Sequence, residues 1–264
     1  MHEDVIACAD LVRRGDPDRF RAVMAAPVAA REKLFPVYAF NLEVSRAPWV
    51  TEEPMIAEMR LQWWRDALGE IRDGGPVRRH EVATPLSGVV DAEGAELLDQ
   101  LVAARRWDVY REPFEDMAHF REYIGKTSAN LLLVAARSLA EMPEDTVQDT
   151  VSDTVREAGY ALGLANWLRA VPALEKAGRI PLVEGTHQAI RALAEEGLDH
   201  LASARAARRT IPPAARPAML VLWQAGPVLK AARNRPGRVG DGTLDTAPFR
   251  SRLTLMARAA TGLW

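Results

Sequence analysis

Apolar residues recur at helical spacing along most of this 264-residue chain, and this periodicity limits the fold more than any other feature. Leu34, Val37, Tyr38 and Leu42, for example, fall on one face of a helix. Almost no segment shows the period-two alternation of β-branched and polar residues that is typical of strands. Because amphipathic helices bury their apolar stripes by packing against one another, we predict an all-α single domain over residues 1–264.

Proline and capping residues mark the helix boundaries. Asp16 is predicted to cap a helix that has Pro17 at its first position, and Pro54 is predicted to open another. Residues 73–90 hold several turn formers, although a helix could also open within 85–90. Further helices are expected at 93–108, 113–140, 145–171, 186–208, 212–232 and 246–262, separated by Pro143, Pro181, Pro212, Pro213 and the 235–242 stretch.

Composition excludes several classes of protein. With 48% hydrophobic and 27% charged residues, the chain is typical of a soluble protein with a full core. A net charge of −2 argues against a nucleic-acid partner held by overall basicity. The single cysteine, Cys8, excludes an internal disulfide, and no Cys/His spacing indicates a zinc site. The chain shows neither an apolar run of about 18 residues nor an apolar signal region, so we expect a cytoplasmic protein.

Two segments carry the functional signal: VYAFNLEVSRAPW at residues 37–49 and NWLRAVPALEKAGRIP at residues 166–181. They resemble the two aspartate-rich motifs of the squalene/phytoene synthase family, which condenses two isoprenoid diphosphates head to head. The run MRLQWWR at 59–65 resembles a further helix of that family, and the runs 122–129 and 159–169 match others in the same order. The resemblance implies an isoprenoid-synthase-like helical bundle.

The resemblance places the four acidic positions of these motifs on residues that are not acidic. The positions fall on Ser45 and Trp49 in the first segment, and on Ala170 and Leu174 in the second. In the family, such acids hold Mg²⁺, which prefers hard oxygen ligands and neutralises the diphosphate leaving group. The residues present keep the four-residue spacing on a helix face but supply no carboxylate. We therefore predict no catalytic residue, no metal ligand and no cofactor here.

Short runs of the chain are similar to a non-catalytic subgroup of this family, the complex I assembly factors of mitochondria and their bacterial relatives. These runs are AFNLE at 39–43 and MRLQW at 59–63. The similarity implies a protein partner, either a subunit of respiratory complex I or an assembly intermediate. Two alternatives stay open. One is a Mg²⁺-dependent head-to-head prenyl transferase of the phytoene or squalene synthase type, and the other is a protein that binds an isoprenoid lipid or a quinone.

Several side chains are candidates for the wall of a retained cavity. The arginines either bind an acidic group such as phosphate, or are solvated or paired with Glu43, Asp66 and Glu175. The aromatic residues either line an apolar tunnel or form simple core, which we favour. Asn166 is either a ligand-orienting amide or a helix-interior residue satisfied by backbone. The remaining candidates are Arg46, Arg65, Arg169, Arg179, Tyr38, Phe40, Trp63, Trp64 and Trp167.

Two features near the C-terminus allow peripheral contact with the inner face of a membrane. The cluster of Arg205, Arg208 and Arg209 either offsets a helix dipole or contacts acidic lipid head groups or a protein partner. The segment 246–262 mixes arginines with large apolar residues. It either lies on a membrane surface or packs on the core, and we favour packing.

Overall fold

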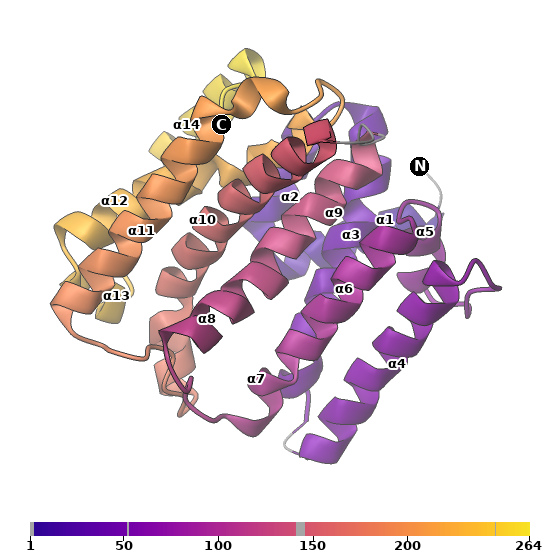
Figure 1. Ribbon diagram of the computed structural model, residues 1–264, viewed down its shortest axis with the longest axis horizontal. Helices are drawn as coiled ribbons and strands as arrows, with labels where there is room; N and C mark the ends of the chain where they lie inside the picture. Colours follow the sequence, from indigo (N-terminus) through magenta and orange to yellow (C-terminus); the bar gives the residue numbers. More distant parts are fainter. Residues whose placement is uncertain (1–2, 52, 141–145, 246) are drawn as a thin grey trace.

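The computed structural model describes residues 3–51, 53–140, 146–245 and 247–264 (Figure 1). Within these ranges the chain is helical and contains no strand, which confirms the all-α prediction. The α-helices are α1 (Glu3–Gly15), α2 (Pro17–Ala25), α3 (Val28–Arg46), α4 (Pro54–Arg72), α5 (Ala83–Ser87), α6 (Ala92–Arg105), α7 (Trp107–Tyr110), α8 (Met117–Ile124), α9 (Asn130–Leu139), α10 (Thr146–Lys176), α11 (His187–Ala206), α12 (Ala225–Asn234), α13 (Gly237–Gly240) and α14 (Pro248–Thr261). The other helical segments are η1 (Ala47–Trp49), η2 (Gly125–Ala129), η3 (Arg208–Thr210) and η4 (Arg216–Gln224), of which η2 is a π-helix and the rest are 3₁₀-helices.

The long helices form a row that covers a central helix. Figure 1 shows α11, α10, α9, α6 and α4 side by side, and each packs against the next. Helix α3 lies behind this row and packs on α9 and α1. Its residues Leu34 to Leu42 are all buried, and the ring of Phe40 meets that of Trp64 on α4 edge-on at 5.1 Å. The core therefore surrounds α3, one of the two helices that carry the motif segments.

The predicted helix starts at Asp16 and Pro54 are confirmed. The Asp16 carboxylate accepts a hydrogen bond from the backbone N–H of Arg19 at 2.9 Å, and Pro17 occupies the first position of α2. Pro54 likewise opens α4. At both positions proline suits the helix because the first N–H groups have no intrahelical acceptor.

Helix α10 passes through Pro172 and continues to Lys176, so the predicted end at residue 171 is wrong. A proline removes one backbone N–H donor from the helix, but the helix ends only where the backbone leaves the helical conformation. That turn is at Gly178, which has a φ of +75°, and the N–H of Arg179 bonds back to the Leu174 carbonyl at 3.0 Å. The extension keeps Leu174 helical, on the same face as Ala170.

The helix predicted at 113–140 begins later and is not uniform. It starts at Met117, because the Asp116 side chain accepts from the backbone N–H of His119 at 2.8 Å and so caps α8. Between α8 and α9 the chain widens into the π-helical turn η2. The widened turn lies against α10, where the Ser128 hydroxyl donates to the carbonyl of Gly159 at 2.8 Å. Propensity alone does not reveal such a turn.

Other boundaries also differ from prediction. The expected 212–232 helix is the 3₁₀ segment η4 followed by α12, since Pro227 has no N–H for a continuous α-helical ladder. The 93–108 helix divides into α6 and α7, and helix α1 was not predicted at all. Pro143 and the expected helix starts at 145 and 246 lie outside the described residues.

The C-terminal helix α14 packs on η4 and α2. Leu255 and the following Trp264 are buried, whereas Phe249 and Met256 are exposed. Of the predicted basic cluster, Arg208 and Arg209 are exposed in η3, and Arg205 donates to the Trp264 carbonyl at 2.7 Å. None of the helices in the described ranges is long and apolar enough to cross a membrane.

A cluster of polar side chains joins α8, α10 and α11. Glu196 on α11 accepts two hydrogen bonds of 2.9 Å from Arg121 on α8 and one of 2.8 Å from the hydroxyl of Tyr160 on α10. Burial alone would raise the pKa of Glu196, but these hydrogen bonds hold it below its ordinary value. The folded-state pKa is therefore lower than the unfolded one. The group stabilises the fold above the unfolded pKa, and this contribution is lost as the pH falls through the folded pKa.

We expect Glu196→Gln to reduce the acid sensitivity of the fold. The wild type should lose more unfolding free energy than this variant as the pH drops from about 7 to about 3.5, because Gln cannot take up a proton. Urea denaturation at the two pH values measures the difference. Glu195→Gln is the matched control. The side chain of Glu195, the residue next to Glu196, is exposed, and the stability of this variant should depend on pH as that of the wild type does. Identical pH dependence in all three proteins would contradict the assignment.

Candidate functional site

The two motif segments face one cavity of about 370 Å³. From α3 and η1, Ser45 and Trp49 line it, and from α10, Ala170 and Leu174 do so. A third wall comes from the end of α6, from α7 and α8, and from the π-turn η2. The four positions that the sequence resemblance matches to the family's acids therefore meet at one site.

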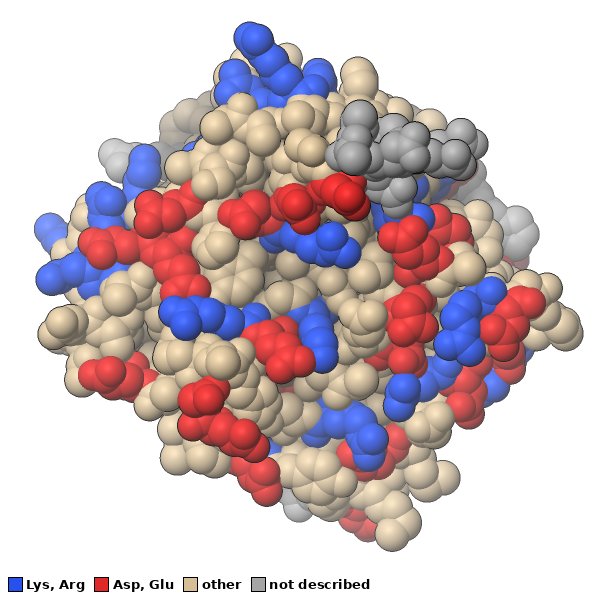
Figure 2. Space-filling model, in the orientation of Figure 1, with Lys and Arg blue, Asp and Glu red and all other residues tan. Residues whose placement is uncertain are grey.

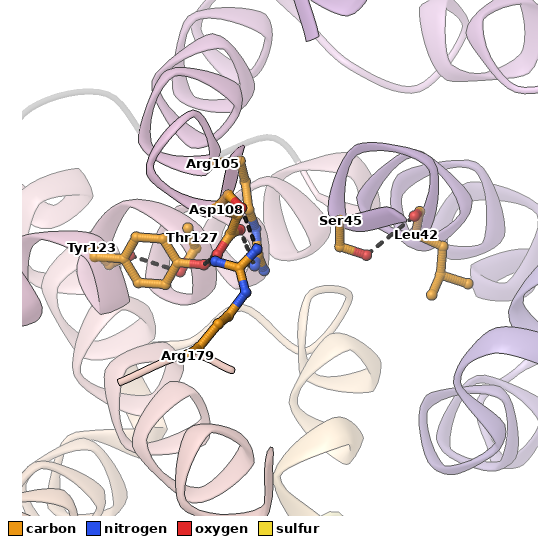
Figure 3. Close-up of polar contacts among 7 residues, drawn as sticks. All are labelled: Leu42, Ser45, Arg105, Asp108, Tyr123, Thr127 and Arg179. Carbon is orange, nitrogen blue, oxygen red and sulfur yellow. Dashed lines mark hydrogen bonds and ion pairs between the residues drawn. The ribbon is translucent and has the colours of Figure 1, made fainter. Parts of the chain in front are cut away.

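The residues at this site do not fit a Mg²⁺ centre. The Ser45 hydroxyl donates to the carbonyl of Leu42 at 3.1 Å, and Trp49, Ala170 and Leu174 offer no oxygen ligand (Figure 3). Asp108 is the one carboxylate among the described residues that line the cavity, and an arginine and a tyrosine already contact it. The described ranges also hold no group of three or more His, Cys, Asp or Glu side chains placed for a metal ion. Mg²⁺ needs several hard oxygen ligands, which this wall lacks.

A buried polar network occupies the third wall. Asp108 accepts hydrogen bonds from the guanidinium of Arg105 at 3.1 Å and from the hydroxyl of Tyr123 at 2.9 Å, and Arg105 also donates to that hydroxyl at 2.7 Å (Figure 3). The Thr127 hydroxyl donates to the Tyr123 carbonyl at 2.7 Å across the start of the π-turn. Asp108, Tyr123 and Thr127 are each at most 4% exposed.

Burial and charge act differently on the pKa values of this network. Burial raises the pKa of Tyr123 well above its ordinary value, so the hydroxyl keeps its proton and donates to Asp108. Burial alone would lower the pKa of Arg105, but Tyr123 and Asp108 raise it overall. The network is therefore an ion pair of Arg105 and Asp108 with a neutral phenol between them.

Arg179 lies next to this network and is 5% exposed. It donates to the backbone carbonyl of Asp108 (Figure 3). Its guanidinium carbon stands 4.6 Å from the ring centroid of Trp49. Its Nε and Nη1 atoms have no hydrogen-bond partner among the described residues. Burial lowers the pKa of Arg179. This cation thus has a carbonyl and an aromatic face beside it, but no carboxylate of the described residues pairs with its side chain.

The structure separates the other predicted residues into two groups. Arg46, Asn166 and Trp167 line the cavity, and the indole N–H of Trp167 donates to the carbonyl of Pro181 at 2.8 Å. Four other aromatic residues, Tyr38, Phe40, Trp63 and Trp64, do not appear in the cavity wall and instead pack within the core or against it.

Arg65 and Arg169 also lie outside the cavity, and the predicted partners of the arginines are wrong. Arg65 forms a two-bond ion pair with Asp99 on α6, at 2.7 and 2.8 Å, rather than pairing with Asp66. Arg169 pairs with Asp18 at 3.0 Å and with Asp245 at 2.7 Å, rather than with Glu175. Aspartates far away in sequence supply the partners, so helical spacing does not reveal them.

Sequence reasoning did not select Arg105 or Asp108. Their three-residue spacing places the two charges on one helix face, a signal that is common in exposed helices. Only the packing of α7 against its neighbours shows that this pair is buried beside Tyr123.

A helical bundle in which two helices direct these motif segments into one cavity defines a squalene/phytoene-synthase-like protein. The family model for squalene/phytoene synthase matches residues 12–184, well over half of the chain, and the chain belongs to this family. Among solved structures, a dehydrosqualene synthase in complex with ligand has a TM-score of 0.81 at 16% identity, covering 98% of this chain and 96% of that one. A squalene synthase from Alicyclobacillus acidocaldarius has a TM-score of 0.68 at 17% identity, covering 88% and 94%. At these identities the likeness shows the fold alone.

The chain is also similar to two proteins that are named as complex I assembly factors. The chain is 27% identical over 185 residues to the NADH dehydrogenase (ubiquinone) complex I, assembly factor 6 homolog of Drosophila melanogaster, covering 66% of this chain and 53% of that protein. It is 23% identical over 167 residues to NADH dehydrogenase (ubiquinone) complex I, assembly factor 6 of Homo sapiens, covering 62% and 48%. The chain thus spans about half the length of these relatives.

Proposed function

We propose that this chain is a non-catalytic member of the squalene/phytoene synthase family that supports the assembly of respiratory complex I. The observation that supports the proposal is the cavity wall, where Ser45, Trp49, Ala170 and Leu174, the residues matched by resemblance to the family's acidic positions, supply no carboxylate. Diphosphate ionisation needs a cation bridge that these side chains do not hold. The similarity to two proteins named as complex I assembly factor 6 supports the role in assembly.

In this proposal the partner is a complex I subunit or an assembly intermediate, and the chain acts in the cytoplasm at the inner face of the membrane. Deleting the gene in its source organism should reduce assembled complex I. Native gels measure the amount of complex, and NADH oxidation by isolated membranes measures its activity. A copy of the wild-type gene should restore both, while succinate oxidation by the same membranes should stay unchanged throughout. Normal complex I in the deletion strain would overturn the assembly role.

An assay of the purified protein distinguishes the non-catalytic proposal from the prenyl transferase alternative. With farnesyl diphosphate and Mg²⁺ the protein should release no more diphosphate than a blank without protein, because the wall supplies one carboxylate and that one is already paired. Substantial diphosphate release would show an enzyme and overturn the non-catalytic part of the proposal, whatever the deletion strain shows.

A further inference from the structure

Positive charge is unevenly distributed along the chain. Residues 201–264 contain 11 of the 34 Lys and Arg residues but only two of the 36 Asp and Glu residues, Asp241 and Asp245. This segment therefore has an excess of nine positive charges, whereas residues 1–200 have an excess of eleven negative charges, which together give the net charge of −2. Such an asymmetry indicates a surface that attracts an anionic partner.

The basic segment lies on one side of the helical bundle. Figure 1 shows α12, α13 and α14 at the same edge of the molecule as α11, which is the edge opposite α4. Figure 2 shows acidic and basic side chains interspersed over the face made by the long helices. At the top of that view, where α11 ends, Lys and Arg side chains gather without acidic side chains between them.

No carboxylate of the described residues forms an ion pair with a cation of this segment. Arg205, Arg208 and Arg216 donate instead to backbone carbonyls, at 2.7, 3.2 and 3.2 Å. Burial, and then the charge of Arg258, lower the pKa of Arg205. One nitrogen of each of these two guanidinium groups is buried without a hydrogen-bond partner in the described ranges. The positive charge on this side of the molecule is therefore not compensated by the described chain.

Helix α14 presents an apolar ridge on the same side. Phe249, Leu253 and Met256 are 73%, 49% and 67% exposed, and their spacing of four and three residues places them on one helix face. Arg252 is also exposed, and it lies three residues after Phe249 and four before Met256, beside the ridge. The helix contains no Asp or Glu. Leu255 is buried, and α14 packs on η4 and α2.

The exposed cations of η3 lie near the end of this ridge. The hydrogen bond from Arg205 to the Trp264 carbonyl joins the end of α11 to the chain that follows α14. Arg208 and Arg209, in η3, come directly after α11 and are exposed. A helix that carries Arg beside exposed Phe, Leu and Met side chains is typical of helices that lie on a bilayer surface.

We propose that α14 and η3 form a docking face for a bilayer that contains anionic lipids. Phe249, Leu253 and Met256 enter the interface between head groups and acyl chains, and the exposed arginines contact the head groups. The cations are spread over several elements of this side rather than converging on one pocket, which matches the continuous negative charge of an anionic bilayer. The inference goes beyond the role in assembly and does not rest on it, because lipid binding is measured with the purified protein.

Co-sedimentation of the purified full chain with vesicles tests the proposal. Vesicles of phosphatidylglycerol and phosphatidylcholine in equal parts should bind the protein at least about tenfold more tightly than vesicles of phosphatidylcholine alone. Raising the salt concentration from about 0.1 M to about 1 M should release the protein, since the Debye length falls from about 10 Å to about 3 Å. Equal binding to both kinds of vesicle, or binding that salt does not weaken, would overturn the proposal. The absence of binding to anionic vesicles would also overturn it, and would leave an acidic protein surface as the partner of this face.

Two matched double variants locate the contact. Arg252→Glu combined with Met256→Glu should weaken binding to the anionic vesicles by about tenfold or more. Arg60→Glu combined with Met59→Glu makes the same changes on α4, where Met59 is 67% exposed, like Met256, and Arg60 is exposed, like Arg252. This control has the same net charge as the first variant, but it should bind within about threefold of the wild type, because its charges lie far from the docking face.

Thermal denaturation confirms that both double variants fold. Equal weakening of vesicle binding in the two folded variants would show that net charge, and not the face made by α14 and η3, governs the binding, and would overturn the proposal.

Discussion

Asp108→Ala is expected to lower the free energy of unfolding by about 3 kcal/mol, because it leaves the guanidinium of Arg105, whose side chain is 20% exposed, without its counter-charge. Asp108 is 4% exposed and accepts hydrogen bonds from both Arg105 and Tyr123. Removing its carboxylate also deprives the Tyr123 hydroxyl of its acceptor, and a buried donor without a partner adds to the loss. Urea denaturation at neutral pH measures the change.

Asp99→Ala provides the control, since it removes the same type of residue from another Arg–Asp pair. The side chains of Arg65 and Asp99 are 34% and 20% exposed, against 20% and 5% for Arg105 and Asp108, so water can replace more of the lost contact. The expected loss is no more than about 1 kcal/mol. A loss for Asp99→Ala equal to or larger than that for Asp108→Ala would show that the buried network does not stabilise the fold as described.

The parts of the fold that depend on residues close to one another in sequence could be predicted. The all-α class follows from apolar periodicity, and the start of α2 follows from Asp16 and Pro17, which act within one turn. The passage of α10 through Pro172 and the π-turn at Gly125–Ala129 could not be predicted. The π-turn depends on packing against α10, far away in sequence, which overrides local preference. Pro172 alone does not mark the end of α10, which comes at the turn of Gly178.

In the candidate site, too, local sequence predicted some residues, whereas others could be recognised only from the packing of the helices. The four motif positions were predicted from the resemblance of two local segments to the family's motifs, and their four-residue spacing places each pair on one helix face. The arginines were more difficult, because nothing local distinguishes Arg65, paired with Asp99, from Arg46, which lies at the cavity. Arg105 and Asp108 were missed because burial, not spacing, makes their pair unusual.

Gly159→Ala is expected to lower the free energy of unfolding by about 3 kcal/mol, although alanine is the better helix former. Helix α10 approaches the π-turn so closely at Gly159 that an added β-carbon would stand 2.6 Å from the Cα of Ala129. That neighbour is backbone and cannot rotate away, so the two elements must separate. The separation would also strain the hydrogen bond from Ser128 to the Gly159 carbonyl.

Gly69→Ala should have the opposite sign, which makes it the decisive comparison. Gly69 lies inside α4, and no atom lies within 4 Å of the position that its β-carbon would take. Alanine there should stabilise the fold by about 0.5–1 kcal/mol through helix propensity alone. Both variants carry the same added methyl group and the same propensity gain, so the difference between their unfolding free energies isolates the close contact at the π-turn. If Gly159→Ala were stabilising to the same extent, α10 and the π-turn would not be in contact, and the third wall of the cavity would not stand where the motif positions face it.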